Sequence, residues 1–84
     1  MKLLLKTTKN FDELMQKFCD EINKKGMGLS SSMEKCSDGY FVVIEYAGEN
    51  RVMNHALKAR ISAKMKKHDD RIEVKIIKGE KDGD

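Results

Sequence analysis

The sequence predicts a single small α+β domain, in which a four-stranded antiparallel sheet carries both helices on one face. Three observations predict this fold. The chain has 84 residues, which suffices for one domain with a modest core. Its apolar residues alternate in four short segments and recur at helical spacing in two longer ones. In chain order these segments read β-α-β-β-α-β.

Residues 2–8 (KLLLKTT) predict the first strand, since their side chains fall alternately on two faces. A helix is expected after Asn10, because Asn10 and Glu13 have the spacing of a capping box. Gly26 is typical of the residue that ends a helix in the left-handed conformation. The apolar side of this helix is formed by Phe11, Leu14, Met15, Phe18, Cys19 and Ile22.

Residues 27–36 (MGLSSSMEKC) alternate loosely and predict a weak strand at an edge of the sheet. Ser37-Asp38-Gly39 indicates a turn into residues 40–46 (YFVVIEY). That run is apolar on both faces and therefore predicts a central strand. One face carries Tyr40, Val42, Ile44 and Tyr46, and the other carries Phe41 and Val43.

Asn50 can cap a second helix over residues 51–68, and residues 71–78 (RIEVKIIK) predict the last strand. The domain is expected to span residues 1–78, with 79–84 as a frayed tail. The helix is expected to turn one stripe toward the core, formed by Met53, Leu57, Ile61 and Met65. The strand is expected to turn inward Ile72, Val74 and Ile76.

The element order matches the ferredoxin-like split βαβ unit, whose first and third strands are central. The first and third strands of this chain are also the most apolar. Right-handed crossovers then place both helices on the same side of the sheet. The opposite, open face would carry Leu4, Lys6, Phe41, Val43, Glu45, Arg71, Glu73 and Lys75.

The sequence carries no catalytic, metal or cofactor signature, so we expect a protein that is not an enzyme. The serines lack a G-x-S-x-G motif and a base partner. Cys19, Cys36, His55 and His68 are too widely spaced for a zinc site. The glycines at 26 and 28 follow a helix rather than precede one, which is the wrong order for a phosphate loop. No apolar run has the length of a membrane span, and we expect a cytoplasmic protein with reduced thiols.

The second helix is the main candidate for a binding surface. The net charge is a mild +3, but the stretch from Arg51 to His68 contains six Lys or Arg and no Asp or Glu. Such a local field is typical of a contact with the phosphates of nucleic acid. The candidate residues are Arg51, Lys58, Arg60, Lys64, Lys66 and Lys67. The plainer interpretation is that these side chains cover core margins and extend into water.

The apolar stripe separates the charges into two ridges. A patch of small residues is expected to let another backbone approach closely, most simply that of the first helix; it is formed by Val52, Ala56, Ala59 and Ala63. An alternative function is a protein-binding inhibitor or adaptor of the kind that phages and mobile elements encode. It would use either the open face around Phe41 and Val43, which also invites a homodimer, or the acidic first helix with Asp12, Glu13, Asp20 and Glu21.

Overall fold

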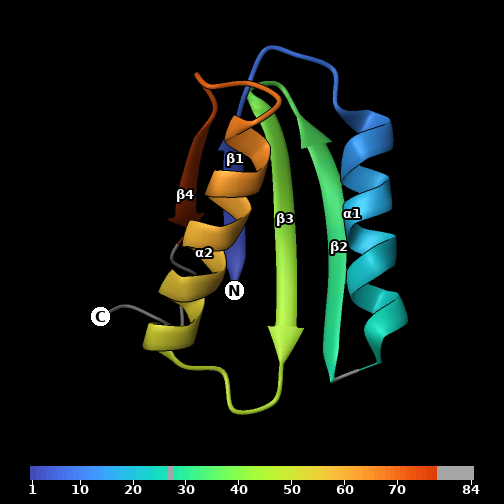
Figure 1. The fold of residues 1–84 in the computed structure, drawn as a ribbon, viewed down its shortest axis with the longest axis vertical. Helices are drawn as coiled ribbons and strands as arrows, with labels where there is room; N and C mark the ends of the chain where they lie inside the picture. The colour runs from blue at the N-terminus through green and yellow to red at the C-terminus, as the bar shows by residue number, and fades with distance from the viewer. Residues whose placement is uncertain (27, 78–84) are drawn as a thin grey trace.

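The computed structural model describes residues 1–26 and 28–77, and it contains the predicted elements in the predicted order. They are β1 (Lys2–Lys6), α1 (Asp12–Lys25), β2 (Leu29–Cys36), β3 (Gly39–Tyr46), α2 (Arg51–Lys66) and β4 (Glu73–Ile77). The strands form one antiparallel sheet in the order β2-β3-β1-β4 (Figure 1). The α+β fold and the central position of β1 and β3 are thus confirmed. The tail predicted over 79–84 lies outside the described residues, as do Met27 and Lys78.

The core lies between one face of the sheet and the two helices. Helix α1 packs against β2 and α2 packs against β4, with β3 visible between the helices in Figure 1. The inward residues predicted for β3 and β4 are buried except Tyr46 and Ile76, which are half-buried and pack against the core, because the period-2 pattern of each strand fixes its faces. The buried cluster consists of Leu3, Leu5, Met15, Tyr40, Val42, Ile44, Ile61, Met65, Ile72 and Val74.

The start of α1 differs from the predicted capping box. The helix begins at Asp12, one residue later than expected, and Asn10 instead accepts a hydrogen bond from the Asp12 amide at 2.9 Å. The residue at the cap position, Phe11, donates its amide to the Tyr40 hydroxyl of β3 at 2.8 Å. A buried side chain of the sheet therefore satisfies the Phe11 amide, which the predicted capping box would have left without a partner. The predicted end is confirmed, since Gly26 adopts the left-handed conformation with φ of 60°.

Strand β2 pairs along its full length with β3, from Leu29 opposite Tyr46 to Cys36 opposite Gly39. It is an edge strand, as predicted, and α1 covers part of its free edge. The Asn23 side chain accepts a hydrogen bond from the Ser31 amide at 2.8 Å and donates one to the Ser31 carbonyl at 2.9 Å. Asn23 thus supplies the partner that a further strand would supply at this position.

Helix α2 differs most from the prediction. Ile61 and Met65 are buried and Leu57 is half-buried, but Met53 is 47% exposed. An i, i+4 spacing advances 400° around a helix, so each step drifts by about 40°. Over three steps Met53 lies about 120° from Met65 and cannot share its contact with the sheet. The predicted core-facing stripe is therefore confirmed at Ile61 and Met65 and wrong at Met53. The loop between helix and strand is also longer than predicted, because α2 ends at Lys66 rather than His68 and β4 begins at Glu73 rather than Arg71.

Gly39 lets β3 begin directly beside β1. Its φ is +146°, and a Cβ at this position would lie 2.0 Å from the Leu5 carbonyl oxygen. No larger residue fits between these two backbones. The turn predicted at residues 37–39 therefore fixes the register of the two central strands as well as the chain reversal.

Candidate nucleic-acid interface

The outward side of α2 is lined by small residues. Because Ile61 and Met65 point to the sheet, the opposite side of the helix faces solvent. This side carries the small-residue patch of Val52, Ala56, Ala59 and Ala63, and all four residues are exposed. The expectation that the patch packs against α1 is wrong. Turning the patch toward α1 would have rotated Ile61 and Met65 away from the core.

Basic side chains border this patch on both sides. At 100° per residue, Arg60 and Lys67 lie on one side of it, and Arg51 and Lys66 lie on the other. All four are exposed. Lys58 lies farther toward the sheet and is half-buried. The two predicted ridges are therefore present, and they border a strip where the helix backbone is thinly covered.

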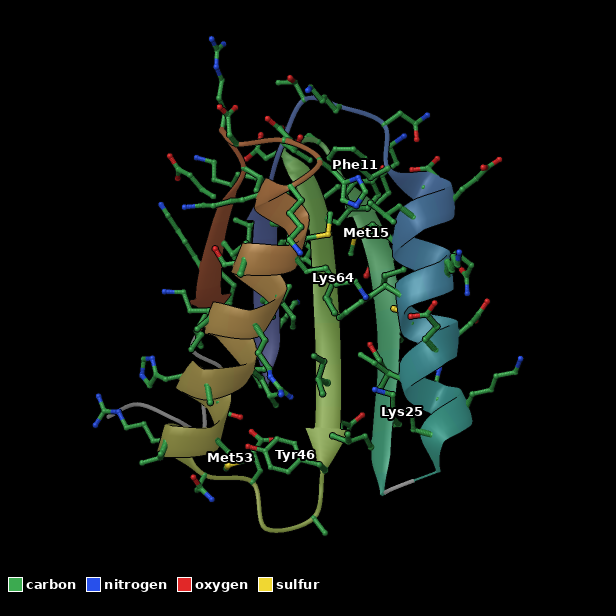
Figure 2. The ribbon with its side chains drawn as sticks, viewed as in Figure 1. Phe11, Met15, Lys25, Tyr46, Met53 and Lys64 are labelled. Atoms are coloured by element: carbon green, nitrogen blue, oxygen red, sulfur yellow. The ribbon has the colours of Figure 1, made fainter. Side chains whose placement is uncertain are left out.

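Lys64 differs from the other basic residues of α2, because it connects the two helices. Its ammonium lies 3.8 Å from a carboxylate oxygen of Glu21 and 5.3 Å from the centre of the Phe18 ring. Figure 2 shows Lys64 reaching from α2 toward α1. Both partners belong to α1, so Lys64 is already engaged within the fold.

The other four Lys and Arg residues of α2, and Lys67 directly after it, have no ion pair with any residue in the described part of the chain. They are Arg51, Lys58, Arg60, Lys66 and Lys67. The first turn of α2 contains no acidic residue either. The positive field of the helix is thus uncompensated locally, as the sequence predicted, except at Lys64.

The acidic residues of α1 form a less available surface. Asp12 accepts a hydrogen bond from the Tyr40 hydroxyl and lies 3.5 Å from the Lys35 ammonium. The Tyr40 hydrogen bond is the main reason why the pKa of Asp12 is lowered. Asp20 accepts a hydrogen bond from Gln16 at 2.9 Å, and Glu21 pairs with Lys64. Glu13 is exposed on the first turn.

A second polar region lies at one end of the sheet. A cavity of about 570 Å³ opens there between the loops that follow β1, β2 and α2. Asp69 is its buried carboxylate, and it accepts hydrogen bonds from the Thr7 hydroxyl at 3.0 Å and the Arg71 amide at 3.1 Å. The Arg71 amide is the main reason why the pKa of Asp69 is lowered. Sequence reasoning missed this residue. The available signal was that an Asp in a loop readily accepts a hydrogen bond from the amide two residues later in the chain, here that of Arg71.

These contacts make Asp69 a structural residue that joins the loop after β1 to the loop after α2. The His68 ring lies edge-on to the Phe11 ring, with 6.4 Å between the ring centroids. Within residues 1–26 and 28–77, no three His, Cys, Asp or Glu side chains gather as metal ligands would. Cys19 is buried and accepts a hydrogen bond from the Ser31 hydroxyl at 3.3 Å.

No helix in the described part of the chain is both long and apolar enough to cross a bilayer. Comparisons with protein families, curated proteins and solved structures gave no match to this chain. The geometry of α2 and of the sheet is therefore the basis for every functional proposal below.

Proposed function

We propose that the protein is a non-enzymatic module that binds nucleic acid through phosphates, using the outward side of α2. One observation carries the proposal: basic residues without an acidic partner in the described structure lie on both sides of a solvent-facing strip of alanines. A stability-driven helix surface interleaves Glu with Lys, and α2 does not. Opposite charges on the backbone of nucleic acid would supply the missing partners.

The dimensions favour double-stranded DNA. The major groove of B-form DNA is about 12 Å wide and admits one α-helix. Ala56, Ala59 and Ala63 allow a close approach, while Arg60 and Lys67 on one side and Lys66 on the other can reach the two flanking phosphate strands. Alanine offers no hydrogen bond to a base edge, so the binding would be sequence-neutral. The groove of A-form RNA is too narrow for this arrangement.

The test is the affinity for a DNA duplex measured by fluorescence anisotropy across a salt series. The logarithm of the affinity is expected to fall linearly with the logarithm of the salt concentration. The double variant Arg60→Gln/Lys67→Gln should reduce the slope by about two, since each phosphate contact contributes about one. The matched control is Lys24→Gln/Lys25→Gln, which removes the same charge from exposed positions at the end of α1 (Lys25 is labelled in Figure 2).

Equal losses in the two double variants would show that net charge alone drives binding and would reject α2 as the interface. Absence of binding to DNA at low salt would reject the function. An RNA duplex and a single strand serve as competitors, and preferential binding of either would reject the groove geometry.

The second candidate function is protein binding, as an inhibitor or adaptor. It is favoured by two large apolar side chains at the start of α2, where Val52 is 79% and Met53 is 47% exposed. Figure 2 shows Met53 near Tyr46, at the end of the molecule where β3 joins α2. A stoichiometric protein complex that survives nuclease treatment and is lost in Val52→Ser/Met53→Ser would support this function over the first.

A cytoplasmic location stays a prediction.

A further inference from the structure

The face of the sheet opposite the helices is not covered by any described element. Its centre is apolar, with Leu4, Phe41, Val43 and Ile77, each half-buried by neighbours in the sheet. Charged residues surround this centre. The Lys2 ammonium lies 4.5 Å from the centre of the Phe41 ring, so even this cation covers part of the apolar surface.

The strand register divides the charges of this face by sign. One row across the four strands reads Glu34, Phe41, Leu4 and Lys75, from β2 to β4. The row is acidic at one end, apolar in the middle and basic at the other end. Outside this row, Glu45 lies on β3, toward the acidic end, and Lys2 and Lys6 lie on β1, toward the basic end. Glu73 on β4 is the exception.

We propose that this face binds a second copy of the chain, related by a two-fold axis that runs parallel to the strands between β3 and β1. Such an axis reverses the order of the strands, so β2 faces β4 and β3 faces β1. The row of Glu34, Phe41, Leu4 and Lys75 then packs against the same row of the second copy in the opposite order. Phe41 packs on Leu4 of the second copy, and Glu34 lies opposite Lys75 of the second copy.

The other rows agree with this arrangement. Ser32 faces Ile77 of the second copy, and Val43 faces Lys2 of the second copy. That Lys2 lies one row away from Glu45 of the first copy. Glu73 lies 3.7 Å from Lys75 of its own chain, and Lys75 can contact both carboxylates. A two-fold axis perpendicular to the strands would instead place each strand over its own copy, so that Glu34 would face β2, which carries no basic side chain on this face. Charge complementarity therefore selects the parallel axis.

The size of the face predicts a weak and reversible dimer. Four strands spaced by about 4.8 Å span about 19 Å. Packed sheets lie about 10 Å apart and cross at about 30°, so the central row makes contact while the corners diverge. The area buried is on the order of 500 Å² per copy, below the roughly 800 Å² of standard stable complexes. Edge-to-edge pairing through β2 is the competing mode, and Asn23 occupies the Ser31 backbone groups that it would need.

The test is sedimentation equilibrium of the full chain with charge exchange. Glu34→Lys places two lysines opposite each other, and Lys75→Glu places two carboxylates opposite each other. Each single variant is expected to weaken dimerisation at least about tenfold. The double variant Glu34→Lys/Lys75→Glu restores opposite charges across the axis and should recover the dissociation constant of the parent. All of these positions are exposed, so the variants are expected to fold.

Glu13→Lys is the matched control, since it makes the same charge change as Glu34→Lys on the exposed start of α1. Phe41→Ser tests the apolar centre and should also weaken the dimer at least about tenfold. A chain that stays monomeric at high concentration overturns the proposal. So does a dimer that tolerates both single charge reversals, or a double variant as weak as either single one. Failure here leaves the proposed function intact, because α2 lies on the other side of the sheet.

Discussion

Tyr40 and Asp69 each form a hydrogen bond with a residue far away in the sequence. The Tyr40 hydroxyl accepts a hydrogen bond from the Phe11 amide and donates one to Asp12, so a side chain of β3 fixes the start of α1. Burial is the main reason why the pKa of Tyr40 is raised. Asp69 joins Thr7 and Arg71 in the same way, and Lys9 lies 3.9 Å from it. Single polar side chains thus connect segments that lie far apart in the sequence.

The lowered pKa of Asp69 predicts the pH dependence of stability. A carboxyl whose folded pKa is depressed stabilises the fold above its ordinary value of about 3.8, and this contribution is lost as the pH falls through the folded pKa. Asp69→Asn should therefore lower the free energy of unfolding at neutral pH and make it less sensitive to acid below about pH 4. Urea unfolding across pH measures both effects.

Asp70→Asn is the control for that experiment, because it makes the same charge change at an exposed neighbouring position. If both variants show the same pH dependence as the parent, the Asp69 contacts do not stabilise the folded state.

At the scale of elements, two contacts decide how the helices sit on the sheet. Asn23 attaches α1 to the edge of β2, and Lys64 spans from α2 to Glu21. The first contact is buried in part and bidentate; the second is exposed and of little energetic weight. We therefore expect the position of α1 to depend on Asn23 much more than on the ion pair between the helices.

Asn23→Ala should lower the free energy of unfolding by about 1–2 kcal/mol, because the Ser31 amide and carbonyl lose their partners. Hydrogen exchange of the Ser31 amide should accelerate more than that of any other β2 amide. Lys24→Ala, at an exposed neighbouring position, should change neither quantity appreciably. Unchanged protection of the Ser31 amide in Asn23→Ala would show that the edge is held by other contacts.

At the scale of the whole molecule, the sheet separates two surfaces. The outward side of α2 lies on one side of it, and the open face with Phe41 lies on the other (Figure 1). A face-to-face dimer would therefore leave both α2 helices accessible, on opposite sides of the assembly. Such a dimer could hold two duplexes but could not place both helices on one short duplex.

The two surfaces should respond to mutation independently. Phe41→Ser should weaken the dimer while leaving the affinity for a short duplex within about twofold, since rigid, separated sites add. Arg60→Gln/Lys67→Gln should weaken duplex binding and leave the dissociation constant of the dimer unchanged. Anisotropy and sedimentation on the same samples measure both. Loss of duplex binding in Phe41→Ser would contradict the separation.

The local periodicity of the sequence predicted six elements and both faces of β3, because the backbone geometry of a strand or helix sets which side chains share a side. It also predicted the unpaired charges of α2, since these depend on composition within one element. The boundaries were less accurate. Local spacing could not show that Tyr40 would bind the Phe11 amide at the start of α1 or that the first strand would end at Lys6.

The sequence by itself determined the α+β order, the central strands and a basic helix with an apolar seam. Tertiary structure decided which part of that helix meets the core, and so it exposed the alanines and Met53 instead of burying them. It also decided that Lys64 is engaged and that Glu34 and Lys75 end the same row of the sheet. The physical reason is that periodicity fixes directions within an element, whereas contacts between elements depend on how the whole core packs.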